Sequence, residues 1–186
     1  MILHDDIELY HGSYTVVENL DISKCAAGKD FGKGFYVTTN PKQAEKFVKS
    51  SVGKALKNGA INSAVTNGYV SIYKYHKVKG VMMYEFTDAD KEWLHCVAAH
   101  RKSGILLDEL DKWDKYDIIV GKIANDNTNQ VITAYINGTY GPIGSDVADN
   151  TAINLLLPQK LTDQICFRNA KALETVAFLN SYEQRI

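Results

Sequence analysis

Apolar and polar residues alternate in several short stretches of the chain, and between these stretches apolar residues recur at helical spacing. The alternating stretches predict strands at residues 7–10, 35–38, 117–121 and 164–168, and a hairpin formed by 69–75 and 81–86. Helical spacing predicts helices at 41–52, 90–102, 127–137 and 145–157, a helical turn at 16–22 and a last helix from 169 onward. This mixture of short strands and interspersed helices predicts an α+β architecture rather than regular βαβ winding.

Three of the predicted helices begin at residues suited to capping. Asn40 fits an N-cap, Pro41 fits the first helical position, and Gln43 fits the third position of a capping box. Thr87 and Asp90 are both candidates to cap the helix that ends near residue 102, and Asn169 is expected to cap the last helix. The apolar residues of the last helix would be Leu173, Val176 and Ala177.

Length and composition set broad limits. The 186 residues favour a single domain spanning 1–186, and 45% hydrophobic and 23% charged residues are ordinary for a soluble globular protein. A net charge of -1 gives no overall attraction to nucleic acid or to an anionic membrane. The N-terminal residues do not resemble a signal peptide, and no apolar run approaches the roughly 20 residues of a membrane span. We therefore expect a cytoplasmic protein with reduced Cys25, Cys96 and Cys166 and no membrane partner.

The glycine-rich run at residues 28–36 does not match a known phosphate-binding motif. Its glycines have neither the spacing of a P-loop nor that of a dinucleotide fingerprint, so the run predicts a glycine-rich turn. A zinc site is also disfavoured, because His95 and His100 are five positions apart on a predicted helix and therefore do not lie on one face as an i, i+4 pair would. We expect no metal.

Three segments together resemble the motifs of a known superfamily. Residues 9–13, Leu-Tyr-His-Gly-Ser, resemble the first motif of the poly(ADP-ribose) polymerase branch of ADP-ribosyltransferases, and residues 31–36, Phe-Gly-Lys-Gly-Phe-Tyr, resemble its second motif. Residues 164–167, Gln-Ile-Cys-Phe, are similar to the third motif, which begins with glutamate in the polymerases. The chain is also similar to an uncharacterised bacterial family of this superfamily, in the stretches DFGKGFYVTTNPKQAEKF, TDADKEWL, YDIIVGKIANDNTNQ and DQICFRNAKAL.

The resemblance implies an ADP-ribosyltransferase-like fold, in which short-stranded split sheets surround a cleft for NAD, the substrate. His11 would hydrogen-bond ribose hydroxyls, Gly12 would bind the nicotinamide carboxamide through its backbone, and Ser13 would support the same edge. Tyr36 would stack on the nicotinamide ring, and Phe47 matches a second aromatic residue that sandwiches that ring. The resemblance thus implies a nicotinamide site built from the first two motifs and the helix that follows them.

Further positions take their expected roles from the same motifs. Gly34 and Phe35 belong to the second motif and are expected beside the bound NAD. Ala44 stands where the polymerases carry a serine that bonds the carboxamide, so we expect that contact to be lost. The residues that the resemblance marks as catalytic are Gln164, His11 and Tyr36.

Strand alternation gives an independent reason to place Tyr36 and Gln164 together. Successive side chains of a strand point to opposite faces. The apolar neighbours of these two residues are Phe35, Val37, Ile165 and Phe167. If these neighbours form the core, Tyr36 and Gln164 both face away from it, as a shared cleft requires.

Gln164 is the main departure from the polymerase pattern. Glutamine accepts a hydrogen bond through its carbonyl oxygen, but it carries no charge and cannot serve as a base near neutral pH. We therefore expect mono-ADP-ribosylation of a protein or nucleic-acid acceptor, with NAD glycohydrolase activity or a weakly active NAD-binding module as alternatives. Asp163 offers a neighbouring carboxylate, although it should point to the opposite face of the strand.

The biological setting and the acceptor stay open at this stage. A bacterial toxin or effector is the expected role, with an antitoxin or regulator as a further partner. Arg101 and residues 125–127 lie in stretches that resemble the bacterial family. They would either line an acceptor site or serve as helix caps and surface groups, and the second interpretation is preferred.

Overall fold

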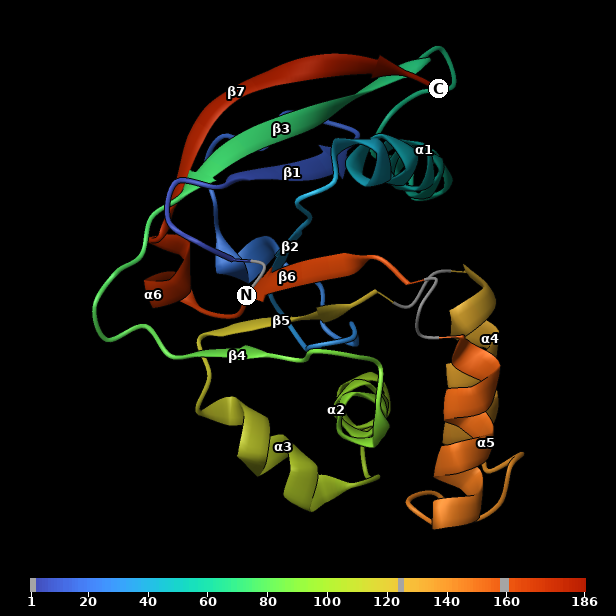
Figure 1. The fold of residues 1–186 in the computed structure, drawn as a ribbon. Helices are drawn as coiled ribbons and strands as arrows, with labels where there is room; N and C mark the ends of the chain where they lie inside the picture. The colour runs from blue at the N-terminus through green and yellow to red at the C-terminus, as the bar shows by residue number, and fades with distance from the viewer. Residues whose placement is uncertain (1–2, 124–125, 158–160) are drawn as a thin grey trace.

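The strands form two sheets that lie one above the other in the computed structural model, which describes residues 3–123, 126–157 and 161–186 (Figure 1). The three-stranded sheet has the order β1-β3-β7 and is antiparallel. Its strands are β1 (Glu8–Ser13), β3 (Asn67–Tyr75) and β7 (Val176–Arg185). The mixed α+β architecture expected from the sequence is confirmed.

The second sheet has the order β2-β6-β5-β4. Its strands are β2 (Phe35–Val37), β6 (Asp163–Phe167), β5 (Ile118–Lys122) and β4 (Met83–Glu85). The pairs β2–β6 and β6–β5 are antiparallel, whereas β5 and β4 are parallel. The second and third sequence motifs therefore lie on adjacent strands.

Helices cover both sheets from different sides (Figure 1). Helix α1 (Pro41–Lys57) packs beside β1 and β3, and α6 (Ala170–Leu173) precedes β7. The helices on the far side of the four-stranded sheet are α2 (Lys91–Arg101), α3 (Leu107–Asp114), α4 (Asp126–Ile136) and α5 (Asp146–Leu156). Within the described residues, no helix has both the length and the apolar character needed to cross a bilayer.

Both faces of the four-stranded sheet are buried, because β5 alternates between two apolar layers. Ile118 and Val120 belong to the layer between the sheets, and Ile119 belongs to the layer that packs against α2. The large residues of the first layer are Leu9, Phe35, Tyr73, Ile165 and Phe167. Those of the second layer are Phe86, Trp93, Leu94, Trp113 and Tyr135. This arrangement fixes which side chains of β2 and β6 face which layer.

Three predicted caps are present, but the capping box is not. The side chains of Asn40, Asp90 and Asn169 accept from backbone N–H groups at the starts of α1, α2 and α6. Gln43 instead donates its side-chain amide to the carbonyl of Asp163, 3.4 Å away, so a contact with β6 replaces the expected box.

Several predicted elements are wrong. The expected hairpin does not exist, because β3 lies between β1 and β7 while β4 pairs with β5 in the other sheet. The last helix ends at Leu173, and the expected helical residues Val176 and Ala177 begin β7 by pairing with β3. The turn at 16–22 is replaced by a 3-10 turn, η1 (Ile22–Lys24), and α3 was not expected. Strand partners distant in sequence override local spacing in the first two cases.

Candidate functional site

His11 joins the first motif to the second. Its Nδ1 lies 2.7 Å from the carbonyl oxygen of Tyr36. Because a carbonyl only accepts, Nδ1 carries the proton and Nε2 is left as an acceptor. Burial lowers the pKa of His11, and the bond to the Tyr36 carbonyl only partly opposes this shift. The ring is therefore held neutral, with its orientation fixed by β2.

Tyr36 is held from the opposite side of β2. Its hydroxyl donates to the carbonyl of Gly32 at 2.8 Å and accepts from the N–H of Phe31 at 2.9 Å. Burial raises the pKa of Tyr36 well above its ordinary value, with a contribution from nearby Cys166. The neutral phenol thus ties the ring to the turn that precedes β2.

Gln164 contacts the same turn. Its side-chain Nε2 donates to Oδ2 of Asp30 at 2.6 Å and, more weakly, to the carbonyl of Lys122 at 3.3 Å. Gln164 is only 6% exposed. Residues 30–32, the buried turn, therefore bond both Tyr36 and Gln164.

The strand register explains why these side chains meet. Tyr36 lies opposite Cys166 in the β2–β6 pair, and Cys166 is two positions from Gln164. Side chains two positions apart share a face, so Tyr36 and Gln164 lie on the face toward α2. The apolar neighbours Phe35 and Val37 fill the layer between the sheets. The expectation that the two side chains share a face is confirmed, but the expectation that this face lies away from the core is wrong, because it packs against the second apolar layer.

Arg101, at the end of α2, completes the polar cluster. Its Nε and Nη2 both reach Oδ1 of Asp30, at 2.8 and 2.5 Å, and its Nη1 donates to Asn129 of α4. Asp30 is 7% exposed, and its Oδ2 faces Gln164. We call Asp30, Arg101 and Gln164 the acid–amide cluster.

No sequence pattern singles out Asp30, and the sequence indicates for Arg101 only a surface or acceptor role. Asp30 is the acidic residue in the glycine-rich run, immediately before the second motif. This place in the sequence is the one feature that could have marked it as a candidate site residue. Its contacts lie 71 and 134 positions away, so local spacing could not reveal them.

Three motif residues have packing roles that need no ligand. A side chain at Gly12 would place Cβ 2.0 Å from the carbonyl oxygen of Ala44, so glycine permits α1 to approach β1. A side chain at Gly34 would meet the Cys166 sulfur at 2.4 Å. Phe35 is buried between the sheets, 4.8 Å from the His11 ring. Any contact of Phe35 with NAD would therefore involve its backbone.

The remaining predicted nicotinamide residues lie around α1. Ser13 is buried on β1, opposite Tyr69 of β3. Ala44 is buried against β1, whereas Phe47 is 45% exposed on the same helix. Core packing therefore does not account for Phe47, and its ring is available to a ligand.

Lys29, which precedes Asp30 of the buried turn, has an altered pKa. Burial lowers the pKa of Lys29, and repulsion from Lys54 of α1 and Arg101 of α2 lowers it further, against attraction from Asp30. Lys29 is therefore held among charges of both signs.

Other polar candidates have structural partners. The Asp163 carboxylate pairs with Lys122 at 3.1 Å, on the face opposite Gln164. His95 pairs with buried Asp149 at 3.0 Å, and Nδ1 of His100 donates to the carbonyl of Cys96. The described residues contain no group of three or more acidic, histidine or cysteine side chains arranged to hold a metal.

The 125–127 segment cannot be compared with its expected acceptor role. Residue 125 lies outside the described residues, and α4 begins at Asp126. Arg101, its companion in that expectation, is held by Asp30 and Asn129. The acceptor role of these residues stays a prediction.

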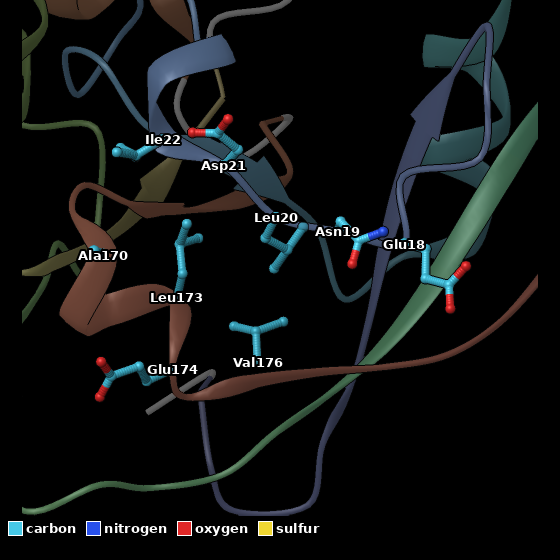
Figure 2. Close-up of a pocket in the computed structure, with 9 residues that line it drawn as sticks. All are labelled: Glu18, Asn19, Leu20, Asp21, Ile22, Ala170, Leu173, Glu174 and Val176. Atoms are coloured by element: carbon cyan, nitrogen blue, oxygen red, sulfur yellow. The ribbon is translucent and has the colours of Figure 1, made fainter.

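An open pocket of about 470 Å³ lies elsewhere, between η1 and the start of β7. Figure 2 shows Leu20, Leu173 and Val176 around its middle, while Asp21 and Glu174 point away from it. None of the residues singled out by the sequence motifs lines this pocket. The candidate site is therefore defined by the contacts around β2 and β6.

The structure defines a mixed α+β protein with polar groups gathered where β1, β2 and β6 meet. The chain belongs to the family described as "Protein of unknown function (DUF3990)", whose profile matches residues 7–178. The matched region contains His11, Tyr36 and Gln164. A comparison with curated proteins gives no match.

Proposed function

We propose that the protein is an NAD-dependent mono-ADP-ribosyltransferase. One observation carries the proposal: three motif residues that are far apart in sequence are linked through a few direct contacts. His11 bonds the Tyr36 carbonyl, while the Tyr36 hydroxyl and the Gln164 amide both bond the buried turn. These links between residues of three separate motifs support the proposal.

The reaction breaks the bond between C1′ of the ribose and the nicotinamide nitrogen. The electron pair of that bond leaves with nicotinamide, which becomes neutral, and positive charge develops on the ribose. A nucleophile of the acceptor then bonds to C1′ and loses its proton to water or to a base of the acceptor. The protein must hold the ribose and nicotinamide in position and stabilise the developing charge.

The residues offer suitable groups for these tasks. Neutral His11 presents Nε2 as an acceptor for a ribose hydroxyl, since Nδ1 is occupied. The exposed ring of Phe47 and the fixed ring of Tyr36 are candidates to hold nicotinamide. Lys29 adjoins the buried turn and is a candidate to pair with the pyrophosphate of NAD.

A second candidate function is NAD binding without efficient catalysis. It is favoured by Gln164, whose neutral amide is nearly buried and already bonded to Asp30. Under this alternative, His11 and Phe47 would still hold NAD, but no macromolecule would become labelled. NAD hydrolysis is an intermediate case, in which water replaces the acceptor.

An assay with labelled NAD and cell lysate separates these functions. The wild type is compared with His11→Ala, Tyr36→Ala and the control Asp117→Asn. Asp117 is a suitable control because it is a buried carboxylate, 9% exposed, that pairs with Lys171 away from the candidate site. We expect label on macromolecules with the wild type and the control only.

The other outcomes are equally specific. Free ADP-ribose without labelled macromolecules would indicate hydrolysis, and NAD binding in calorimetry without cleavage would indicate a binding module. If the wild type neither cleaves nor binds NAD, the proposed function is wrong.

A further inference from the structure

A carboxylate is present in the candidate site although the third motif carries none. Asp30 belongs to the buried turn, and it is as buried as Gln164. Its Oδ2 accepts from the Gln164 amide at 2.6 Å, and its Oδ1 accepts from Arg101. A single hydrogen bond therefore separates Gln164 from the carboxylate of Asp30.

The arrangement gives this charge a direction. Arg101 approaches Oδ1 from α2, so this cation lies on the Oδ1 side of the carboxylate. Oδ2 is directed toward β6, where it accepts from the neutral amide of Gln164. The negative end of the ion pair thus faces the strand that carries the third motif. Phe31 and Gly32, the next residues of the same turn, bond the Tyr36 hydroxyl. These bonds fix the position of the Asp30 carboxylate relative to Tyr36.

We propose that Asp30 supplies the negative charge that stabilises the ribosyl cation during NAD cleavage, and that Gln164 is a positioning residue for Asp30. This inference rests on the proposed function. Asp30 takes no proton in this step: nicotinamide leaves with the bonding electron pair, and the acceptor proton leaves as described above. A preorganised charge in a site that excludes water has a large effect on such a transition state.

The arrangement also changes the expectation for Gln164→Glu. If the site lacked a negative charge, introducing a glutamate would be expected to raise turnover. In the structure, however, the substitution would place a second carboxylate against Asp30, and like charges at hydrogen-bond distance cannot both ionise readily. Gln164→Glu alone is therefore expected to lower the stability of the protein near neutral pH, without a gain in turnover.

Asp30→Asn tests the proposal with little change in shape. The introduced amide can direct its oxygen to Arg101 and its nitrogen to Gln164, which can turn its own amide to accept. We expect kcat for nicotinamide release to fall roughly 10²–10³-fold, as for loss of one preorganised transition-state contact, with little change in KM for NAD. Asp117→Asn, the matched buried control, should retain wild-type kcat.

The double variant Asp30→Asn/Gln164→Glu exchanges the amide and the carboxylate while keeping the net charge. It should fold like the wild type and recover a substantial part of the kcat lost in Asp30→Asn. A purely structural role for Asp30 would not produce this split between kcat and KM or the rescue by relocated charge. If Asp30→Asn does not fold, the test rests on the kcat of the double variant, provided that this variant folds. A folded double variant without turnover would overturn the proposal.

The outcomes distinguish the inference from the function on which it rests. If the wild type releases nicotinamide and folded Asp30→Asn does so at the same kcat, the role of Asp30 is overturned and the proposed function stands. If the wild type neither releases nicotinamide nor binds NAD in calorimetry, both are overturned.

Discussion

The strands β2 and β6 present two faces that differ in character. One face is apolar and packs between the two sheets; its residues are Phe35, Val37, Ile165 and Phe167. The other face carries Tyr36 and Gln164, whose polar atoms bond the buried turn. Both faces are covered by protein, so burial alone does not distinguish packing from candidate chemistry.

The difference lies in how the polar atoms are satisfied. On the apolar face, shape and burial determine the fit, and a lost side chain leaves a cavity. On the polar face, the Tyr36 hydroxyl and the Gln164 amide nitrogen bond particular partners, and Asp30 places a carboxylate there. Substitutions on the first face should therefore change stability, whereas those on the second should also change the response to NAD.

The largest effect on stability is expected from Phe167→Ala on the apolar face. Phe167 is completely buried between the sheets, so the change removes a large side chain from the core. We expect the free energy of unfolding to fall by about 3–5 kcal/mol. Urea unfolding measures this change. NAD cleavage per folded molecule should be unaffected. A loss of cleavage by the folded variant would contradict the assignment of this face to packing alone.

Tyr36→Phe should have a smaller effect, because it keeps the ring and removes only the hydroxyl. The Phe31 N–H and the Gly32 carbonyl each lose a partner in a covered region. We expect a loss of roughly 1–3 kcal/mol in the free energy of unfolding, the cost of leaving such groups unsatisfied. Calorimetry should show NAD binding retained in Tyr36→Phe and lost in Tyr36→Ala. Equal loss in both variants would mean that the hydroxyl, rather than the ring, is what NAD binding requires.

The smallest effect is expected from the titration of His11. Burial lowers its pKa in the folded protein, so the unfolded chain binds a proton first as the pH falls. Stability should therefore decrease as the pH falls below the ordinary histidine value of about 6.5 and through the lower folded pKa. His11→Asn should weaken this dependence in urea unfolding. Part of it should persist, because burial lowers the pKa of His100 as well; an unchanged dependence would exclude His11 as a contributor.

Local sequence features predicted the motif strands well. The alternation around Tyr36 and Gln164 placed their apolar neighbours in the core, and their register confirms that both lie on the other face. Asn40 and Pro41 likewise marked the start of α1. These features depend on residues close in sequence, which is why a single chain sufficed to predict them.

Partners distant in sequence could not be predicted in the same way. The residues after Leu173 have apolar spacing compatible with a helix, but pairing with β3 makes them a strand. The contacts of Asp30 with Arg101 and Gln164 likewise depend on how the loop, α2 and β6 come together. The resemblance marked the motif residues, and only the folded chain revealed the carboxylate that bonds Gln164.

Release of nicotinamide from NAD is the most direct test of the central claim that His11, Tyr36 and the acid–amide cluster form an NAD-cleaving site. The measurement compares the wild type with Tyr36→Ala and Asp117→Asn under identical conditions, together with a check that each protein is folded. The account predicts release by the wild type and by Asp117→Asn, and none above background by Tyr36→Ala. Release by folded Tyr36→Ala at the wild-type rate would contradict it, as would the absence of both NAD cleavage and NAD binding by the wild type.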